Sequence, residues 1–182
     1  MHGVDPVRRT SPLIAGTTLW VMADDPGNPS KETLLSGPAL PSGERKRVGL
    51  LVEDNLADVL LVQDAIEYYN LPVELYVIDD GDAACQFFER AEIDPEAPCP
   101  EFLLLDLNLP KRSGKEVLQR VRQSEKCKHI PVLIITSSDL SKDREELSAL
   151  GANRYFRKPS DYEGFLKVGE VLKDLLRKDV LN

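Results

Sequence analysis

Residues 102–110 have the sequence FLLLDLNLP, and this stretch decides how the chain is expected to fold. Four consecutive apolar residues are followed at once by the acidic Asp106, and Pro110 comes four residues later. An apolar run of this length without polar alternation is typical of a parallel strand that helices cover on both faces. The stretch therefore predicts a buried strand that ends at a carboxylate.

Similar short apolar runs lie on both sides of this one, and amphipathic segments with apolar residues at helical spacing separate them. The predicted strands are 48–52, 73–78, 102–105, 132–135 and 154–157, and the predicted helices are 56–69, 82–90, 114–123, 142–150 and 162–176. Strict alternation of strand and helix predicts an α/β fold, here a flavodoxin-like (βα)5 doubly wound five-stranded parallel sheet.

The first 45 residues differ in composition and hydrophobic pattern from the rest of the chain. They contain scattered Pro, Gly and Ser with no sustained helical or strand period, so we expect a disordered N-terminal extension at 1–45. The folded domain is expected at 46–178, and 179–182 form a short tail that cannot hold an output module. Translation could also begin at Met22.

Charge and hydropathy restrict the partners. The chain has a formal net charge of −8, and acidic residues outnumber basic ones within 46–182, so nucleic-acid binding is disfavoured. The mildly apolar stretch at 13–23 follows Arg8 and Arg9 but is far too short to span a bilayer. We expect no membrane partner and a cytoplasmic protein.

The chain has few cysteines and histidines from which a disulfide framework, a metal site or a catalytic triad could be built. Cys85, Cys99 and Cys127 are an odd number without metal-ligand spacing, which predicts free thiols in a reducing compartment. His2 and His129 are the two histidines of the chain, so a histidine metal site or a Ser/His/Asp triad is not expected.

Polar residues follow four of the predicted strands where each one ends. Glu53 and Asp54 follow the first strand, Asp106 follows the third, Thr136 the fourth, and Lys158 the fifth. Each alone would be an ordinary cap or solvated charge, but the carboxyl ends of parallel strands meet at one edge of the sheet. Clustered carboxylates at an open site suit Mg²⁺, and an aspartate beside a metal can attack phosphorus.

Four motifs with this spacing resemble the receiver domains of bacterial two-component signalling. They are LLVEDN (50–55), LLLDLNLPKRSG (103–114), PVLIITSS (131–138) and GANRYFRKP (151–159). The resemblance covers residues 46–178. DLNLP and the Pro-containing segment at 94–100 are most similar to stand-alone regulators that are paired with phytochrome-type histidine kinases.

The resemblance implies a role for each residue of the cluster. Asp106 would accept a phosphoryl group from a sensor histidine kinase, and Lys158 would bind the phosphoryl oxygens. Asp54 would ligate Mg²⁺ directly, Glu53 mainly through water, and Asn108 through its backbone carbonyl. The family also tunes the lifetime of the phosphoryl bond at the positions of Asn108 and Ser138.

The resemblance further implies a switch. Thr136 would move toward the phosphoryl group and let the ring of Tyr155 turn inward, which changes the face formed by the fourth helix, the fifth strand and the last helix. A downstream protein or a second copy would bind that face. Its expected ion-pair formers are Arg144, Glu145, Arg154 and Asp174. A cis bond between Lys158 and Pro159 is also expected.

Three other functions compete with this interpretation. A phosphorylation-independent binding module should have lost an acidic, acceptor or lysine residue, and none is missing. A hydrolase with an aspartyl nucleophile generally needs a second acid nearby, but Asn108 stands two residues after Asp106. A flavodoxin-like cofactor binder would need a phosphate-cradling glycine loop, which the sequence lacks. We therefore expect a phosphoacceptor that takes part in its own phosphorylation and slow dephosphorylation rather than a true enzyme.

Overall fold

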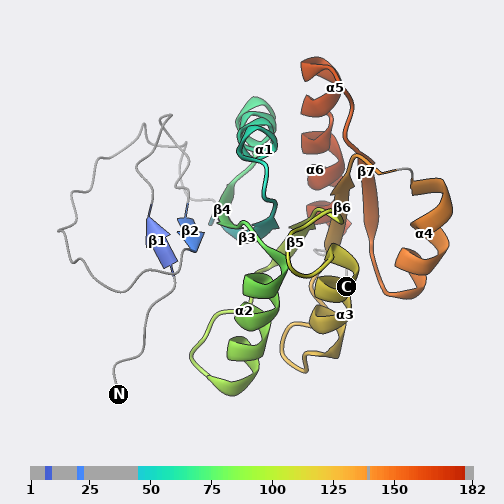
Figure 1. The fold of residues 1–182 in the computed structure, drawn as a ribbon. Helices are drawn as coiled ribbons and strands as arrows, with labels where there is room; N and C mark the ends of the chain where they lie inside the picture. Colours follow the sequence, from blue (N-terminus) through green and yellow to red (C-terminus); the bar gives the residue numbers. More distant parts are fainter. Residues whose placement is uncertain (1–6, 10–19, 23–44, 139, 179–182) are drawn as a thin grey trace.

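The structure is a computed structural model that describes residues 7–9, 20–22, 45–138 and 140–178. Its centre is one sheet with the strand order β1-β2-β4-β3-β5-β6-β7 (Figure 1). The strands are β1 (Val7–Arg9), β2 (Trp20–Met22), β3 (Arg47–Val52), β4 (Val73–Ile78), β5 (Phe102–Leu105), β6 (Val132–Thr136) and β7 (Arg154–Arg157). The five strands predicted from the sequence are β3 to β7, and neighbouring pairs among them are parallel. The predicted flavodoxin-like layout is confirmed for these strands.

Helices cover both faces of this sheet. They are α1 (Leu56–Tyr68), α2 (Gly81–Ile93), α3 (Gly114–Gln123), α4 (Leu140–Ala149), α5 (Tyr162–Leu166) and α6 (Val168–Lys178). The first core cluster contains residues of α2, α3 and α4, and the second contains residues of α1, α5 and α6. No helix among the described residues combines the length and apolar character that crossing a bilayer requires.

The apolar strands form the rigid base of the molecule. All four residues of β5 are buried, with Leu103 and Leu105 in the first core cluster and Phe102 and Leu104 in the second. Side chains therefore alternate between two covered faces, as expected for a parallel strand. Gly49 lies against the ring of Phe102, where a β-carbon would collide with the aromatic carbons.

The last predicted helix is interrupted. The sequence predicts one helix over 162–176, whereas α5 ends at Leu166 and α6 begins at Val168. The amide of Lys167 donates to the carbonyl of Gly164, and the amide of Glu170 donates to that of Lys167. These i to i+3 bonds tighten the turn locally, and a side-chain pattern cannot reveal such a change.

The N-terminal segment differs from its expectation at two places. β2 pairs in parallel with β4 at the edge of the sheet, and β1 pairs antiparallel with β2. These two three-residue strands lie within the segment for which a disordered extension was expected, and with them the sheet has seven strands rather than the predicted five. Backbone pairing to an open sheet edge does not require an apolar pattern, so no local signal marks these strands. Residues 1–6, 10–19 and 23–44 and the 179–182 tail lie outside the described residues.

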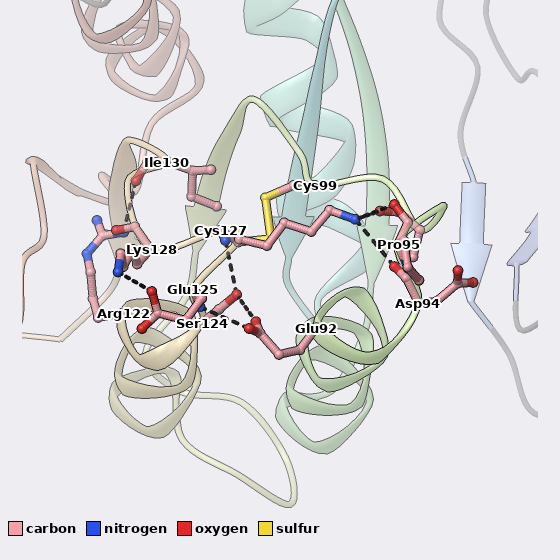
Figure 2. The surroundings of a disulfide bond; sticks show 12 residues. Glu92, Asp94, Pro95, Cys99, Arg122, Ser124, Glu125, Cys127, Lys128 and Ile130 are labelled. Atoms are coloured by element: carbon pink, nitrogen blue, oxygen red, sulfur yellow. Dashed lines mark hydrogen bonds and ion pairs between the residues drawn. A yellow bond between two sulfur atoms is a disulfide. The ribbon is translucent and has the colours of Figure 1, made fainter.

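A disulfide joins two loops at the amino ends of the central strands (Figure 2). Cys99 precedes β5, Cys127 precedes β6, and their Cα atoms are 5.8 Å apart. The expectation of three free thiols is therefore wrong, because the neighbouring positions of β5 and β6 bring together cysteines 28 residues apart. Cys85 is free and buried.

Lys126, next to this disulfide in the sequence, ties the same two loops together. Its ammonium donates to the backbone carbonyls of Asp94, Pro95 and Ala97, at 3.3, 2.9 and 2.6 Å. These carbonyls lie in the loop that leads from α2 to Cys99. The two loops are thus held by a covalent bond and by a charged donor, on the opposite edge of the sheet from Asp106.

Alkylation of the denatured protein should show this bond. Without reductant one thiol per chain, Cys85, should react, and after reduction all three cysteines should react. Reduction should also lower the free energy of unfolding by about 2–4 kcal/mol, measured by urea denaturation, because the unfolded chain is then less constrained. A Cys99→Ser variant should lose this sensitivity to reductant. Three reactive thiols before reduction would contradict the pairing.

Candidate functional site

Three carboxylates meet at the carboxyl edge of the sheet. β3 ends at Val52 opposite Leu105 of β5, so Glu53 and Asp106, which follow these partners, are placed side by side. Glu53, Asp54 and Asp106 each have a carboxylate oxygen within 4.8 Å of the others. Glu53 and Asp106 are buried, at 2% and 4% exposure, whereas Asp54 is exposed.

The ammonium of Lys158 lies among these groups. It comes from the residue after β7 and donates to Glu53 Oε2 at 2.7 Å and to Asp106 Oδ2 at 2.8 Å. The Lys158 side chain is only 8% exposed. The structure thus brings together Lys158 and all three predicted acids from separate strand ends.

Sequence reasoning missed a fourth carboxylate. Asp58, in the first turn of α1, accepts a hydrogen bond from the Lys158 ammonium at 2.9 Å. The sequence marks Asp58 only as an acid in the first turn of the predicted helix, where carboxylates are common. Its contact with Lys158 arises only because α1 packs beside the loop that carries the lysine.

Burial dominates the acid–base character of Glu53. The pKa of its carboxyl is raised from 4.5 to about 7, and loss of solvent is the largest cause. The hydrogen bond and charge of Lys158 lower this pKa, and the negative charge of Asp106 raises it. Burial lowers the pKa of Lys158, but its hydrogen bonds to Asp106, Glu53 and Asp58 outweigh that effect, and the pKa is raised. One ammonium therefore faces more negative charge than it can neutralise.

A second group of polar side chains surrounds the hydroxyl of Thr136. The side-chain amide of Asn108 donates to Thr136 Oγ1 at 3.4 Å and to Ser138 Oγ at 3.0 Å. The amide N–H of Ser138 donates to Thr136 Oγ1 at 3.3 Å, and that of Asn108 donates to Asp106 Oδ1 at 3.1 Å. Asp106 and Thr136 are thus connected through a single residue, Asn108.

Tyr155 lies in β7, which pairs in parallel with β6, the strand that ends at Thr136. Its ring packs against the first core cluster, and the Arg144 guanidinium lies 5.3 Å from the ring centroid. The Tyr155 hydroxyl is buried without a hydrogen-bond partner among the described residues. A plain surface tyrosine with its hydroxyl in water is therefore excluded.

The peptide bond between Lys158 and Pro159 is trans, as are the other bonds between described residues. The cis bond expected from the family resemblance is therefore wrong for this structure. The trans form is the ordinary preference of an X–Pro bond. Lys158 reaches its three carboxylates from this trans backbone.

The donor set fits a hard divalent cation. The grouped oxygens of Glu53, Asp54 and Asp106 are the ligand type that Mg²⁺ takes. Both Glu53 oxygens accept hydrogen bonds, from Asn55 N–H and from Lys158, whereas the Asp54 side chain has no such partner among the described residues. Asp54 is therefore the acid with the most free ligand capacity, in keeping with its predicted direct role.

Comparison with known proteins identifies the family. The sequence model of one protein family, the response regulator receiver domain, matches residues 50–168. The chain belongs to this family. Response regulator Rcp1 of Synechocystis sp. is 37% identical over 122 residues, which cover 67% of this chain and 83% of Rcp1.

Solved receiver structures agree with the fold. The phosphorylated cyanobacterial phytochrome response regulator RcpA has a TM-score of 0.63 at 30% identity, covering 71% of this chain and 92% of its own. The Mn²⁺-bound form of Rcp1 has a TM-score of 0.62 at 35% identity, covering 70% and 91%. The chain is thus a receiver domain with a response regulator's role in phosphorelay signalling, similar to regulators that are named for phytochromes.

The raised pKa of Glu53 gives this receiver domain a pH-dependent stability. Between pH 4.5, the ordinary value for Glu, and about pH 7, the folded protein holds a proton that the unfolded chain has released. Stability should therefore fall as pH rises through this range, when no divalent ion is present. Urea denaturation in chelator from pH 5 to 8 should show this slope, and Glu53→Gln should flatten it. Equal slopes in the two proteins would contradict the assignment.

Proposed function

We propose that Asp106 is the phosphoacceptor of this response regulator and that a sensor histidine kinase is the phosphodonor. The observation that carries the proposal is the contact of a buried aspartate with the Lys158 ammonium, at the end of a central strand and within reach of two further acids. The phosphoryl group would leave the kinase imidazole, which keeps the electron pair of the broken N–P bond. An Asp106 carboxylate oxygen would form the new O–P bond.

Mg²⁺ is the cofactor that we propose for the acids Glu53, Asp54 and Asp106, with the Asn108 carbonyl as a further ligand. When bound, it would offset the negative charge of the phosphoryl oxygens and of the acids. Lys158 would supply the second positive charge and donate to a phosphoryl oxygen. Asn108 holds one Asp106 oxygen through its amide N–H, which orients the carboxylate.

Phosphorylation would be transmitted through Thr136 and Tyr155. The Thr136 hydroxyl already accepts from Asn108, and a phosphoryl group on Asp106 would offer it a stronger acceptor. Movement of Thr136 would change the space beside Tyr155, whose hydroxyl is buried without a partner among the described residues. Arg144 on α4 lies over the same ring, so a change at Tyr155 would reach the face of α4, β7 and α6.

That face is the surface that we propose for the downstream protein or for a second copy of the chain. Glu145 and Arg154 supply exposed or half-exposed charges there, and Arg144 lies on the same helix as Glu145. The kinase would be of the phytochrome type, because RcpA and a bacteriophytochrome response regulator with a TM-score of 0.59 are among the similar structures. Phosphoryl transfer from such a kinase supports a cytoplasmic location.

Loss of the phosphoryl group would be slow self-catalysed hydrolysis. Asn108 and Ser138 hydrogen-bond each other beside Asp106 and would control the approach of water. We expect this hydrolysis to be slow because Asn108, an amide and not an acid, stands two residues after Asp106, where an efficient aspartyl phosphatase generally has a proton donor. The phosphorylation-independent alternative is not favoured, because every residue that the chemistry needs is present and converges.

Asp106→Asn should abolish covalent labelling by acetyl phosphate with Mg²⁺, measured as the mass of one added phosphoryl group on the intact protein. The amide lacks the nucleophilic carboxylate oxygen. The matched control is Asp79→Asn, since Asp79 is an exposed acid that follows β4 at the same sheet edge. Labelling of the Asp106→Asn variant, or loss of labelling in the control alone, would reject the site.

Tyr155→Phe should leave the unphosphorylated protein at least as stable as the wild type, with a gain of up to about 1 kcal/mol in urea denaturation. The variant removes a buried hydroxyl that lacks a partner among the described residues and keeps the ring. Tyr162→Phe is the control for removal of a tyrosine hydroxyl that does have a partner, because the exposed Tyr162 hydroxyl donates a hydrogen bond to Asp64 at 3.2 Å. A clear loss of stability in Tyr155→Phe would mean that its hydroxyl is hydrogen-bonded.

A further inference from the structure

We propose that Asp58 is a positioning residue for Lys158, and that it holds the ammonium beside Asp106 while the phosphoryl group arrives. This inference rests on the proposed function of Asp106. The observation behind it is the 2.9 Å contact between Lys158 Nζ and Asp58 Oδ2, which joins residues 100 positions apart. Among the described residues, Lys158 is the ion-pair partner of Asp58.

The ammonium of Lys158 has no spare donor. A lysine carries three N–H groups, and here they point to Glu53, Asp58 and Asp106 at 2.7, 2.9 and 2.8 Å. A phosphoryl oxygen can be bound only after one of these contacts opens. The choice of contact decides whether the ammonium stays at the site or leaves it.

The three partners of Lys158 are not equivalent. Glu53 and Asp106 belong to the group of oxygens that can share a cation, and Asp58 does not. Phosphorylation turns the Asp106 carboxylate into an acyl phosphate and removes its own negative charge. A divalent cation would compete with the ammonium for Glu53. Asp58 is therefore the one partner of the three that neither the cation nor the phosphoryl group alters.

The fold holds Asp58 in place. It lies in the first turn of α1, whose N-cap Asn55 accepts from the amide of Ala57. The next residue, Val59, is buried in the core together with Val62, which fixes the rotation of the helix. The partial positive charge of a helix N-terminus also favours a carboxylate there. That effect alone would explain an acid at this position but not its contact with Lys158.

Asp58→Asn tests the inference through the rate of acetyl phosphate labelling at increasing Mg²⁺. We expect the maximal rate at saturating Mg²⁺ to fall about 3- to 10-fold, as for the loss of a charged hydrogen bond at a partly exposed site. Asp58→Glu restores the carboxylate and should recover part of this rate. Glu67→Gln, which removes an exposed acid from the far end of α1, should leave the rate unchanged.

A second measurement observes Lys158 itself. In ¹⁵N-lysine-labelled protein, the ammonium signal that is missing from a Lys158→Arg variant reports proton exchange at Lys158. Asp58→Asn should accelerate this exchange, while circular dichroism stays that of the wild type. A merely structural role of Asp58 would not change the exchange in a folded variant. Should the Asn variant fail to fold, Asp58→Ser, which suits a first helical turn, takes its place.

The outcomes separate this inference from the function on which it rests. An unchanged maximal rate or an unchanged Lys158 signal in folded Asp58→Asn would overturn the role of Asp58. A fall in rate of the same size in Glu67→Gln would also overturn it, since general charge would then be the cause. A wild-type protein that acetyl phosphate does not label would refute the proposed function, and the ammonium signal would then decide the role of Asp58.

Discussion

The contact of one buried ammonium with three carboxylates is the interaction on which the site depends. Lys158 lies after β7, while its partners follow β3 and β5 or lie in α1. Carboxylates this close together repel each other, and burying them without a cation would be strongly unfavourable. The ammonium offsets part of that cost. The excess negative charge that remains suits the site to a divalent cation.

The apolar sheet makes this concentration of charge possible. β3, β5 and β6 are buried between two layers of helices, so their ends cannot move independently to relieve the repulsion. The switch elements lie on the same base, since Thr136 ends β6 and Tyr155 lies on β7. At the opposite edge, the disulfide and Lys126 hold the loops that lead into β5 and β6. The central strands are thus constrained at both ends.

Several features depended on contacts between distant segments and could not be predicted. Asp58 looked like an ordinary acid of a first helical turn until α1 packed beside Lys158. Cys99 and Cys127 had no telling spacing, and only the pairing of β5 with β6 brought them together. The resemblance to the family implied a cis bond between Lys158 and Pro159, but this bond is trans. Lys158 contacts its three carboxylates from the trans backbone.

The sequence by itself determined the five parallel strands, most of the helix bounds and the set of acids, hydroxyl and lysine at the strand ends. It could do so because burial of a parallel strand on both faces imposes an apolar run, and because parallel strands end at a common edge. Only the tertiary structure decided which carboxylates share the ammonium, which described hydroxyl is buried without a partner and which thiols meet. Such pairings depend on distances of a few ångströms between segments far apart in the chain, and no local pattern records these distances.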